Sequence, residues 1–319
     1  MFLWVLRSVP LEDVWVMLAR LGLTQILALI LANGLVSLTL SGRWWLILRA
    51  QGYPIPYLTV AGYRLAAFGV SYFTPGPQFG GEPLQVHLVQ QRHQVARSTA
   101  ISAVTLDKSL ELLVNFAFLT AGVACILLWQ AFPWVPVRQA IILPLLLLAL
   151  PVGFLLAIWG GRHPVSGPLK AGVGLLSRQK PLADVPWLSR YAKVHQAIRD
   201  SEEEATRFCQ ESPLTLVQAL LVSLVSWIAI VGEYWLMLRL LGLNLSPVQV
   251  ISTLTAARIA ILLPLPGGLG TLEASQVLAL GAFGLNPAAG ISLSLLIRVR
   301  DVALGSLGLW WGGVKSQLP

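Results

Sequence analysis

The stretch RWWLILRAQG at residues 43–52 recurs as EYWLMLRLLG at residues 233–242. Further along, TPGPQFGGE at 74–82 and LPGGLGTLE at 265–273 share a pattern, because each ends in a glutamate seven residues after a proline. The two copies lie about 190 residues apart in both cases. This matching order and spacing predict that the chain contains two copies of one ancestral unit.

A pair of opposite charges follows each copy at the same offset. Lys108 and Glu111 stand three residues apart, and Arg298 and Asp301 have the same spacing. Residues three apart lie on one face of a helix, so each pair is expected to form an internal ion pair. Buried pairs can simply fix how helices pack, so the sequence leaves both a structural and a functional role open for these four residues.

The composition indicates an integral membrane protein. Hydrophobic residues make up 56% of the 319 residues, charged residues only 11%, and the mean hydropathy is +0.73. Long continuous apolar runs predict membrane-spanning helices, since barrel strands would alternate with a period of two. We therefore predict an all-α integral membrane protein, with spans near residues 21–41, 112–129, 139–159, 214–238 and 288–312.

Missing motifs exclude several classes of function. The two cysteines, Cys125 and Cys209, cannot form a disulfide framework, and the four histidines show no metal-ligand spacing such as HExxH. No GxSxG, P-loop GxxxxGK or Rossmann GxGxxG sequence is found. The net charge of +8 comes without a nucleic-acid-binding motif. We expect no metal, no cofactor, no catalytic residues and no nucleic-acid partner.

The apolar and polar segments divide the chain into four regions. Residues 1–20 are interrupted by charges and lack a signal-peptide cleavage site, so we expect them to lie along the membrane interface. Residues 21–129 form the first repeat and residues 214–319 the second, each with a span, a re-entrant hairpin broken by Pro and Gly, and another span. Residues 130–213 contain a linking span and a polar, amphipathic connector.

The basic residues predict how the repeats are oriented. The segment 160–213 holds eight Lys and Arg residues, and by this span count it shares one side of the membrane with Arg43, Arg49, Arg92 and Arg97. The positive-inside rule makes that side the cytoplasm. The first hairpin then opens inward and the second outward. This predicts an inverted-repeat helical bundle with a substrate site near the bilayer midplane, as in many transporters.

Three arginines within the apolar segments are candidate substrate-binding residues. A charge inside a span costs about 2.5 to 3.5 kcal/mol on insertion scales, so it needs a partner or a function. Arg64, Arg258 and Arg300 are charges of this kind. A guanidinium group is planar, stays charged and binds two phosphate oxygens at once, so an arginine that faces an internal cavity suits an anionic headgroup.

The glycines of the two hairpins are further candidates. Glycine allows sharp turns, and each turn precedes a helix whose N-terminal amides could meet an anion. The alternative is that these are only tight turns. Glu82 and Glu273 could cap the helix starts, exchange protons or bind a cationic headgroup, and the sequence leaves all three roles open. The candidate glycines are Gly76, Gly80, Gly81, Gly267, Gly268 and Gly270.

At these hairpins the sequence resembles the lysylphosphatidylglycerol synthase transmembrane region family, a flippase-like membrane family. The second motif, LPLPGGLGTLEA, is the more diagnostic, whereas the first departs from the usual PGG pattern by placing Pro77 and Gln78 before its paired glycines. Larger members join this region to a soluble aminoacyl-transfer domain, which we do not expect here because the chain stops at Pro319. The residues that resemble the family are Pro75, Gly76, Gly80, Gly81, Glu82, Pro264, Pro266, Gly267, Gly268, Gly270 and Glu273.

The resemblance implies lipid translocation in a prokaryotic plasma membrane, with the substrate unspecified. Our leading hypothesis is a flippase or transporter for a lipid with a polar, phosphate-bearing headgroup, anionic or zwitterionic. The alternatives are a membrane enzyme or enzyme subunit acting on lipid-linked headgroups or sugars, and a scaffold without catalytic function. The direction of movement, the energy source and a homo-oligomeric state all stay open.

Overall fold

A computed structural model describes residues 11–19, 21–74, 80–132, 137–177, 187–263, 265 and 268–317. Every regular element in these residues is a helix, as the sequence predicts. The helices are α2 Leu11–Ala19, α3 Leu23–Ala50, α4 Tyr57–Phe73, α5 Glu82–His93, α6 Arg97–Leu128, α7 Val137–Trp159, α8 Ser166–Ser177, α9 Trp187–Glu211, α10 Pro213–Leu240, α11 Pro247–Ile261, α12 Thr271–Ala282 and α13 Pro287–Gln317.

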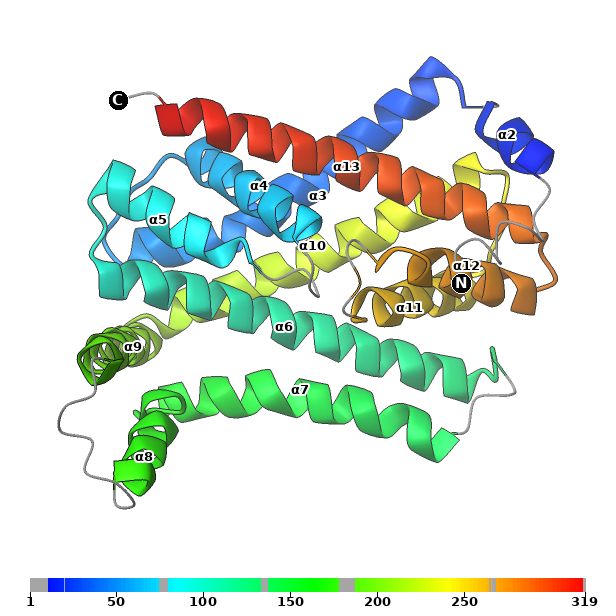
Figure 1. The fold of residues 1–319 in the computed structure, drawn as a ribbon. Helices are drawn as coiled ribbons and strands as arrows, with labels where there is room; N and C mark the ends of the chain where they lie inside the picture. The colour runs from blue at the N-terminus through cyan, green and yellow to red at the C-terminus, as the bar shows by residue number, and fades with distance from the viewer. Residues whose placement is uncertain are drawn as a thin grey trace.

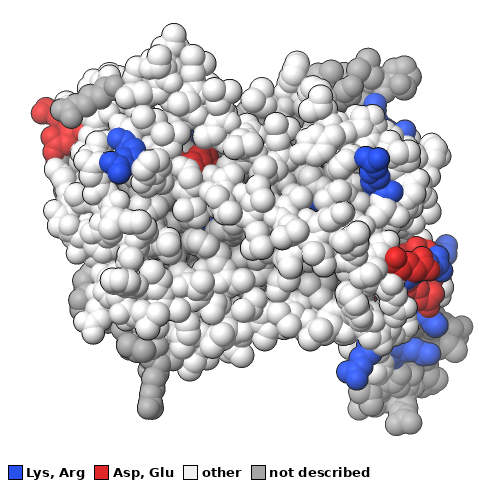
Figure 2. Space-filling view, turned by 180° about the vertical axis from the view of Figure 1, so that it is seen from behind, with Lys and Arg blue, Asp and Glu red and all other residues white. Residues whose placement is uncertain are grey.

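Four of the described helices, α3, α6, α7 and α10, are long and apolar enough to cross a membrane. Their lipid-facing side chains are apolar, and Leu31, for example, is 74% exposed. In Figure 2 the middle of the visible face is almost uncharged, while charged side chains gather toward its two ends. The long helix α13, which carries Arg298, Arg300 and Asp301, is not among these four.

The helices α3 to α6 and α10 to α13 correspond in order and length. They contain 28, 17, 12 and 32 residues in the first set and 28, 15, 12 and 31 in the second. In Figure 1, α3 and α10 run in opposite directions, and so do α6 and α13. The α4–α5 hairpin lies at the left of the bundle and the α11–α12 hairpin at the right. The inverted repeat itself stays a prediction.

The hairpin limbs are shorter than a membrane span. The longest, α4, has 17 residues, and α5 and α12 have 12 each. At 1.5 Å per residue the limbs are about 18 to 26 Å long, against ~30 Å for the hydrocarbon core. These lengths fit the re-entrant hairpins predicted from the sequence, and re-entry itself stays a prediction.

Close packing between α4 and α13 depends on glycines. A Cβ atom on Gly308 would lie 2.0 Å from the carbonyl oxygen of Leu65, and one on Gly69 would lie 2.5 Å from that of Gly305. Small residues let helix backbones approach closely in a membrane, where no hydrophobic effect drives the helices together. These glycines bring the first hairpin against the last long helix.

We expect the Gly308→Ala substitution to lower the free energy of unfolding by about 1 to 3 kcal/mol, because the added methyl group must push α4 away from α13. The matched control is Gly232→Ala in α10, where an added Cβ atom meets nothing within 4 Å. That control should leave stability unchanged or raise it by about 1 kcal/mol. Thermal unfolding of the purified variants in detergent measures both. Equal midpoints for Gly308→Ala and the wild type would contradict the close approach.

The connector between the two helix sets contains α8 and α9. Buried Glu202 of α9 holds the start of α8, since its carboxylate accepts hydrogen bonds from the backbone N–H of Val165 at 2.7 Å and of Ser166. Cys209 is buried on the side of α9 that packs against the bundle, and burial raises the pKa of its thiol to about 11. Because the thiolate is the reactive form, Cys209 should react slowly at neutral pH.

Candidate functional site

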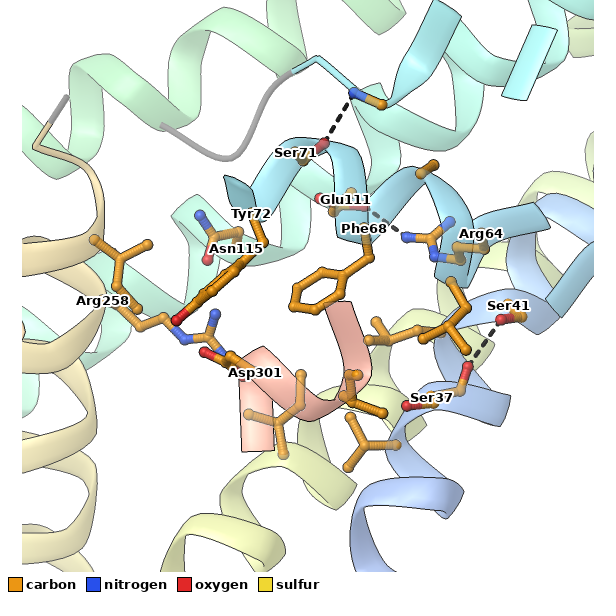
Figure 3. Close-up of a pocket in the computed structure, with 18 of the residues that line it drawn as sticks. Ser37, Ser41, Arg64, Phe68, Ser71, Tyr72, Glu111, Asn115, Arg258 and Asp301 are labelled. Carbon is orange, nitrogen blue, oxygen red and sulfur yellow. Dashed lines mark hydrogen bonds and ion pairs between the residues drawn. The ribbon is translucent and has the colours of Figure 1, made fainter. Parts of the chain in front are cut away.

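A cavity of 340 Å³ lies between the two helix sets and is lined by residues of α3 to α6 and α10 to α13. Figure 3 shows its walls, with Arg258 and Tyr72 at one end and Arg64 near the other. Much of the lining is apolar, but nine charged residues also face the cavity. They are Arg64, Glu82, Asp107, Lys108, Glu111, Glu233, Arg258, Arg300 and Asp301.

Two arginines and two carboxylates form a network on the first helix set. Arg43 of α3 donates to Asp107 at 2.7 Å and to Glu111 at 3.2 Å. Arg64 of α4 donates to the same two carboxylates, at 2.5 and 2.6 Å. Asp107 and Arg43 are only 3% and 2% exposed, so this network joins α3, α4 and α6 in a place that water barely reaches.

Lys108 links the network to the first hairpin. Its Nζ lies 2.8 Å from Glu111, the partner expected from the sequence, and 3.2 Å from Glu82 at the start of α5. All three side chains are between one fifth and one third exposed. These are therefore the more accessible charges of the first set.

The second helix set has a corresponding but different arrangement. Arg300 bridges Glu233 at 3.1 Å and Asp301 at 2.8 Å, and Glu233 also accepts a hydrogen bond from Asn33 at 2.9 Å. Arg298 donates to Glu273 at the start of α12, with its Nη2 2.9 Å from the carboxylate.

The sequence spacing suggested that Arg298 and Asp301 neutralise each other, and the structure corrects this. Arg298 bonds to Glu273 and Asp301 bonds to Arg300. The three-residue spacing permits the local pair, but the α12 carboxylate and the neighbouring arginine offer closer partners.

The hairpin glycines shape the two turns, and their described amides already have partners. The N–H of Gly80 donates to Glu82 at 2.8 Å, that of Gly81 to Ser71 at 2.9 Å, and that of Gly270 to Glu273 at 2.9 Å. The two glutamates thus cap their own helix starts, one of the three roles that the sequence leaves open. These three amides are not free to bind an anion.

Glycine is required at these turns for steric reasons. Gly80, Gly268 and Gly270 have φ values of +129°, +63° and +80°, which side chains disfavour. A Cβ atom on Gly81 would lie 2.1 Å from the carbonyl oxygen of Ala67. The remaining predicted positions, Gly76 and Gly267, lie outside the described residues, as do Pro75, Pro77, Gln78, Pro264 and Pro266.

Arg258 of α11 differs from the other two predicted arginines. Arg64 and Arg300 each bridge two carboxylates, so they have the partners that a charge inside a span needs. The guanidinium of Arg258 lies over the ring of Trp227, 4.8 Å from its centroid. No hydrogen bond or ion pair joins it to another residue in the described part of the chain. In Figure 3 it extends into the cavity beneath Tyr72 and beside Asp301.

Several site residues were not predicted from the sequence. We placed Arg43 among the basic residues at one membrane face, but it is buried in the network with Asp107. Asp107 and Glu233 also lie within apolar segments, but they were not among the predicted site residues. The signal that was missed is the first position of the repeated motif, where Arg43 in one copy corresponds to Glu233 in the other and both face partners inside the bundle.

Comparison with known proteins gives one family match and two similar membrane proteins. A family model described as the lysylphosphatidylglycerol synthase TM region matches residues 1–308. A UPF0104 membrane protein of Methanocaldococcus jannaschii is 21% identical over 281 residues, which cover 86% of this chain and 79% of the relative. A UPF0104 membrane protein of Methanothermobacter thermautotrophicus is 20% identical over 267 residues, which cover 81% of this chain and 75% of the relative. No solved structure shows significant similarity.

Proposed function

Because the chain belongs to the lysylphosphatidylglycerol synthase transmembrane region family, we propose that it moves lipids with a polar, phosphate-bearing headgroup across the prokaryotic plasma membrane. The observation that carries this proposal is a charged cavity inside a membrane helix bundle, with Arg258 lacking a carboxylate partner among the described residues. A charge at membrane depth is expensive, and an anionic ligand would compensate it.

The size and lining of the cavity suit a headgroup better than a whole lipid. Its 340 Å³ is at the lower end of the range for small-molecule sites. In this proposal the phosphate binds Arg258, while Tyr72 and Phe68 contact the uncharged part of the headgroup. The hydrocarbon chains stay in the bilayer, so they remain in apolar surroundings throughout.

The acidic residues offer a place for a positive charge or a proton. Glu111 and Glu82 are the most exposed carboxylates of the first network, with side chains 33% and 25% exposed. Glu82 could contact the ammonium group of a zwitterionic headgroup or bind a proton that drives transport, whereas Glu111 already holds Arg43, Arg64 and Lys108. Glu273 is less suited to this role, since it is 3% exposed and holds Arg298.

Transport requires that the cavity open to each side in turn. An inverted repeat provides two equivalent hairpins for this purpose. The opposite directions of α3 and α10, and the hairpins at opposite ends of the bundle in Figure 1, support that arrangement. With the basic α8–α9 connector in the cytoplasm, the first hairpin enters from the cytoplasmic side and the second from the outside.

A vesicle assay tests the proposal. The purified protein is reconstituted with phosphatidylglycerol that carries a fluorescent acyl chain, so that its headgroup stays intact. A membrane-impermeant quencher added outside the vesicles then reports how fast labelled lipids move from the inner leaflet to the outer leaflet. We expect quenching beyond the outer-leaflet fraction, at a rate that rises with the protein-to-lipid ratio. No acceleration over protein-free vesicles, with this lipid or with the lipids that copurify, would refute the proposal.

The same vesicles distinguish the enzymatic alternative. Mass spectrometry of the lipids after incubation should show them unaltered. A chemically modified headgroup would instead favour a membrane enzyme, with the cavity carboxylates as its acid and base. Lipids that copurify with the protein would identify the headgroup among phospholipids, aminoacylated lipids and polyprenyl phosphates.

A further inference from the structure

A second groove runs along the outside of the bundle between α5 and α6. On α5 it is lined by Glu82, Val86 and Gln90, which share one helix face, with Pro83 and His87 beside them. On α6 it is lined by Arg97, Ile101, Val104 and Thr105. The two helices are antiparallel, so Gln90 and Arg97 lie at the outer end of the groove and Glu82 and Thr105 at the inner end.

The groove runs along the first part of α6 and meets the central cavity at Glu82. From Arg97 to Lys108 helix α6 rises about 16 Å, or roughly half the hydrocarbon thickness. Among the residues that line the groove, Glu82 alone also lines the cavity. Its ion pair with Lys108, at 3.2 Å, therefore stands at the junction of the two spaces.

Helix α5 is unusually polar for its position. Its sequence is EPLQVHLVQQRH, and two of its polar side chains line the groove, His87, which is exposed, and Gln90, which is partly exposed. Histidine and glutamine side chains facing hydrocarbon would lose their hydrogen bonds to water. A polar face at this depth implies that water or polar headgroups occupy the groove beside it.

We propose that the α5–α6 groove is the lateral route by which a phosphate-bearing lipid headgroup passes between one leaflet and the central cavity, with the Glu82–Lys108 ion pair closing its inner end. This inference rests on the proposed function. The exposed guanidinium of Arg97 lies where a lipid phosphate first arrives, and Lys108 is the next cation inward. A lipid fits this route because its chains can remain in the bilayer outside the groove while its headgroup moves along it.

The passing phosphate would exchange partners with the ion pair at the inner end. Lys108 is held by two carboxylates, Glu82 and Glu111, so it can keep one while a phosphate replaces the other. The released Glu82 is the more mobile partner, because it belongs to the short hairpin helix. The pair is only partly buried, which keeps the cost of opening it small compared with that of a fully buried pair.

The route is tested with a single reactive cysteine on its wall. The parent protein carries Cys125→Ser and keeps Cys209, whose buried thiol reacts slowly. Gln90→Cys places a thiol in the groove, and Thr105→Cys places one on the facing wall. The matched control is Gln91→Cys, the neighbouring glutamine, which is exposed but does not line the groove.

Two measurements are made on each variant. The first is the rate of maleimide labelling in detergent, with phosphatidylglycerol or with inorganic phosphate added. Lipid at about four times its Kd should slow labelling of both groove variants about fivefold, and phosphate should not. The second is lipid movement in vesicles after labelling with a bulky maleimide. We expect a loss of about tenfold for the groove variants and little change for Gln91→Cys.

Each outcome separates this inference from the proposed function. If labelled Gln90→Cys and Thr105→Cys move lipid as fast as labelled Gln91→Cys, the groove is not the route, although transport stands. Protection by inorganic phosphate alone would make the groove a free-anion site and also overturn the inference. If the unlabelled wild type moves no lipid, the proposed function fails and the route fails with it.

Discussion

Replacing Arg258 with alanine should slow lipid movement in vesicles by about tenfold to a hundredfold, the effect of removing one charge-assisted hydrogen bond to phosphate. The same substitution should leave the thermal unfolding midpoint unchanged or raise it. The reason is that Arg258 has no carboxylate partner among the described residues, so its removal strands no opposite charge inside the bundle. Loss of transport with unchanged or increased stability is typical of a binding residue.

Arg239→Ala is the matched control for this prediction. Arg239 also lies over a tryptophan ring, that of Trp235, with its guanidinium 5.0 Å from the centroid, but it is exposed at the end of α10. Its removal deletes the same kind of cation–π contact without touching the cavity. Transport should be normal in that variant. Arg258→Lys keeps the positive charge but lacks the planar guanidinium group that can bind two phosphate oxygens at once. Its transport rate should therefore lie between those of Arg258→Ala and the wild type. Equal rates for Arg258→Ala and Arg239→Ala would remove Arg258 from the site.

Asp107→Asn should be the most destabilising single substitution in the network. Asp107 is 3% exposed and accepts hydrogen bonds from both Arg43 and Arg64. Neutralising it leaves two guanidinium groups to share Glu111, and breaking a buried pair in this way costs about 3 to 5 kcal/mol. For a chain of this size the unfolding midpoint in detergent should fall by roughly 5 to 10 °C.

The control for Asp107→Asn is Glu203→Gln. Glu203 pairs with Arg199 on α9 at 2.9 Å, but its side chain is half exposed, so the change should be within about 0.5 kcal/mol. Adding Arg43→Gln to Asp107→Asn should cost less than the sum of the single substitutions, because the second change removes a charge that the first left unpaired. A midpoint for Asp107→Asn as high as that of the control would show that the buried network contributes little to stability.

The secondary structure followed closely from the sequence. The spans predicted at 139–159 and 214–238 correspond to α7 and α10, which begin and end within two residues of those bounds. The span predicted at 112–129 is the second half of α6, which begins earlier, at Arg97. These elements are predictable because apolar length and Pro/Gly turns act locally along the chain. The four-region division and the orientation in the membrane remain predictions.

The sequence by itself determined that this is a helical membrane protein with duplicated motifs and charges at unusual depth, because composition, run length and spacing depend only on neighbours along the chain. Only the tertiary structure decided which charges meet. Asp107 bonds to Arg43, which lies 64 residues earlier in the chain, and to Arg64, which lies 43 residues earlier. Asn33 donates to Glu233, which lies 200 residues later. Such contacts depend on which helices pack together, and that packing leaves Arg258 facing the cavity while Arg64 and Arg300 are neutralised.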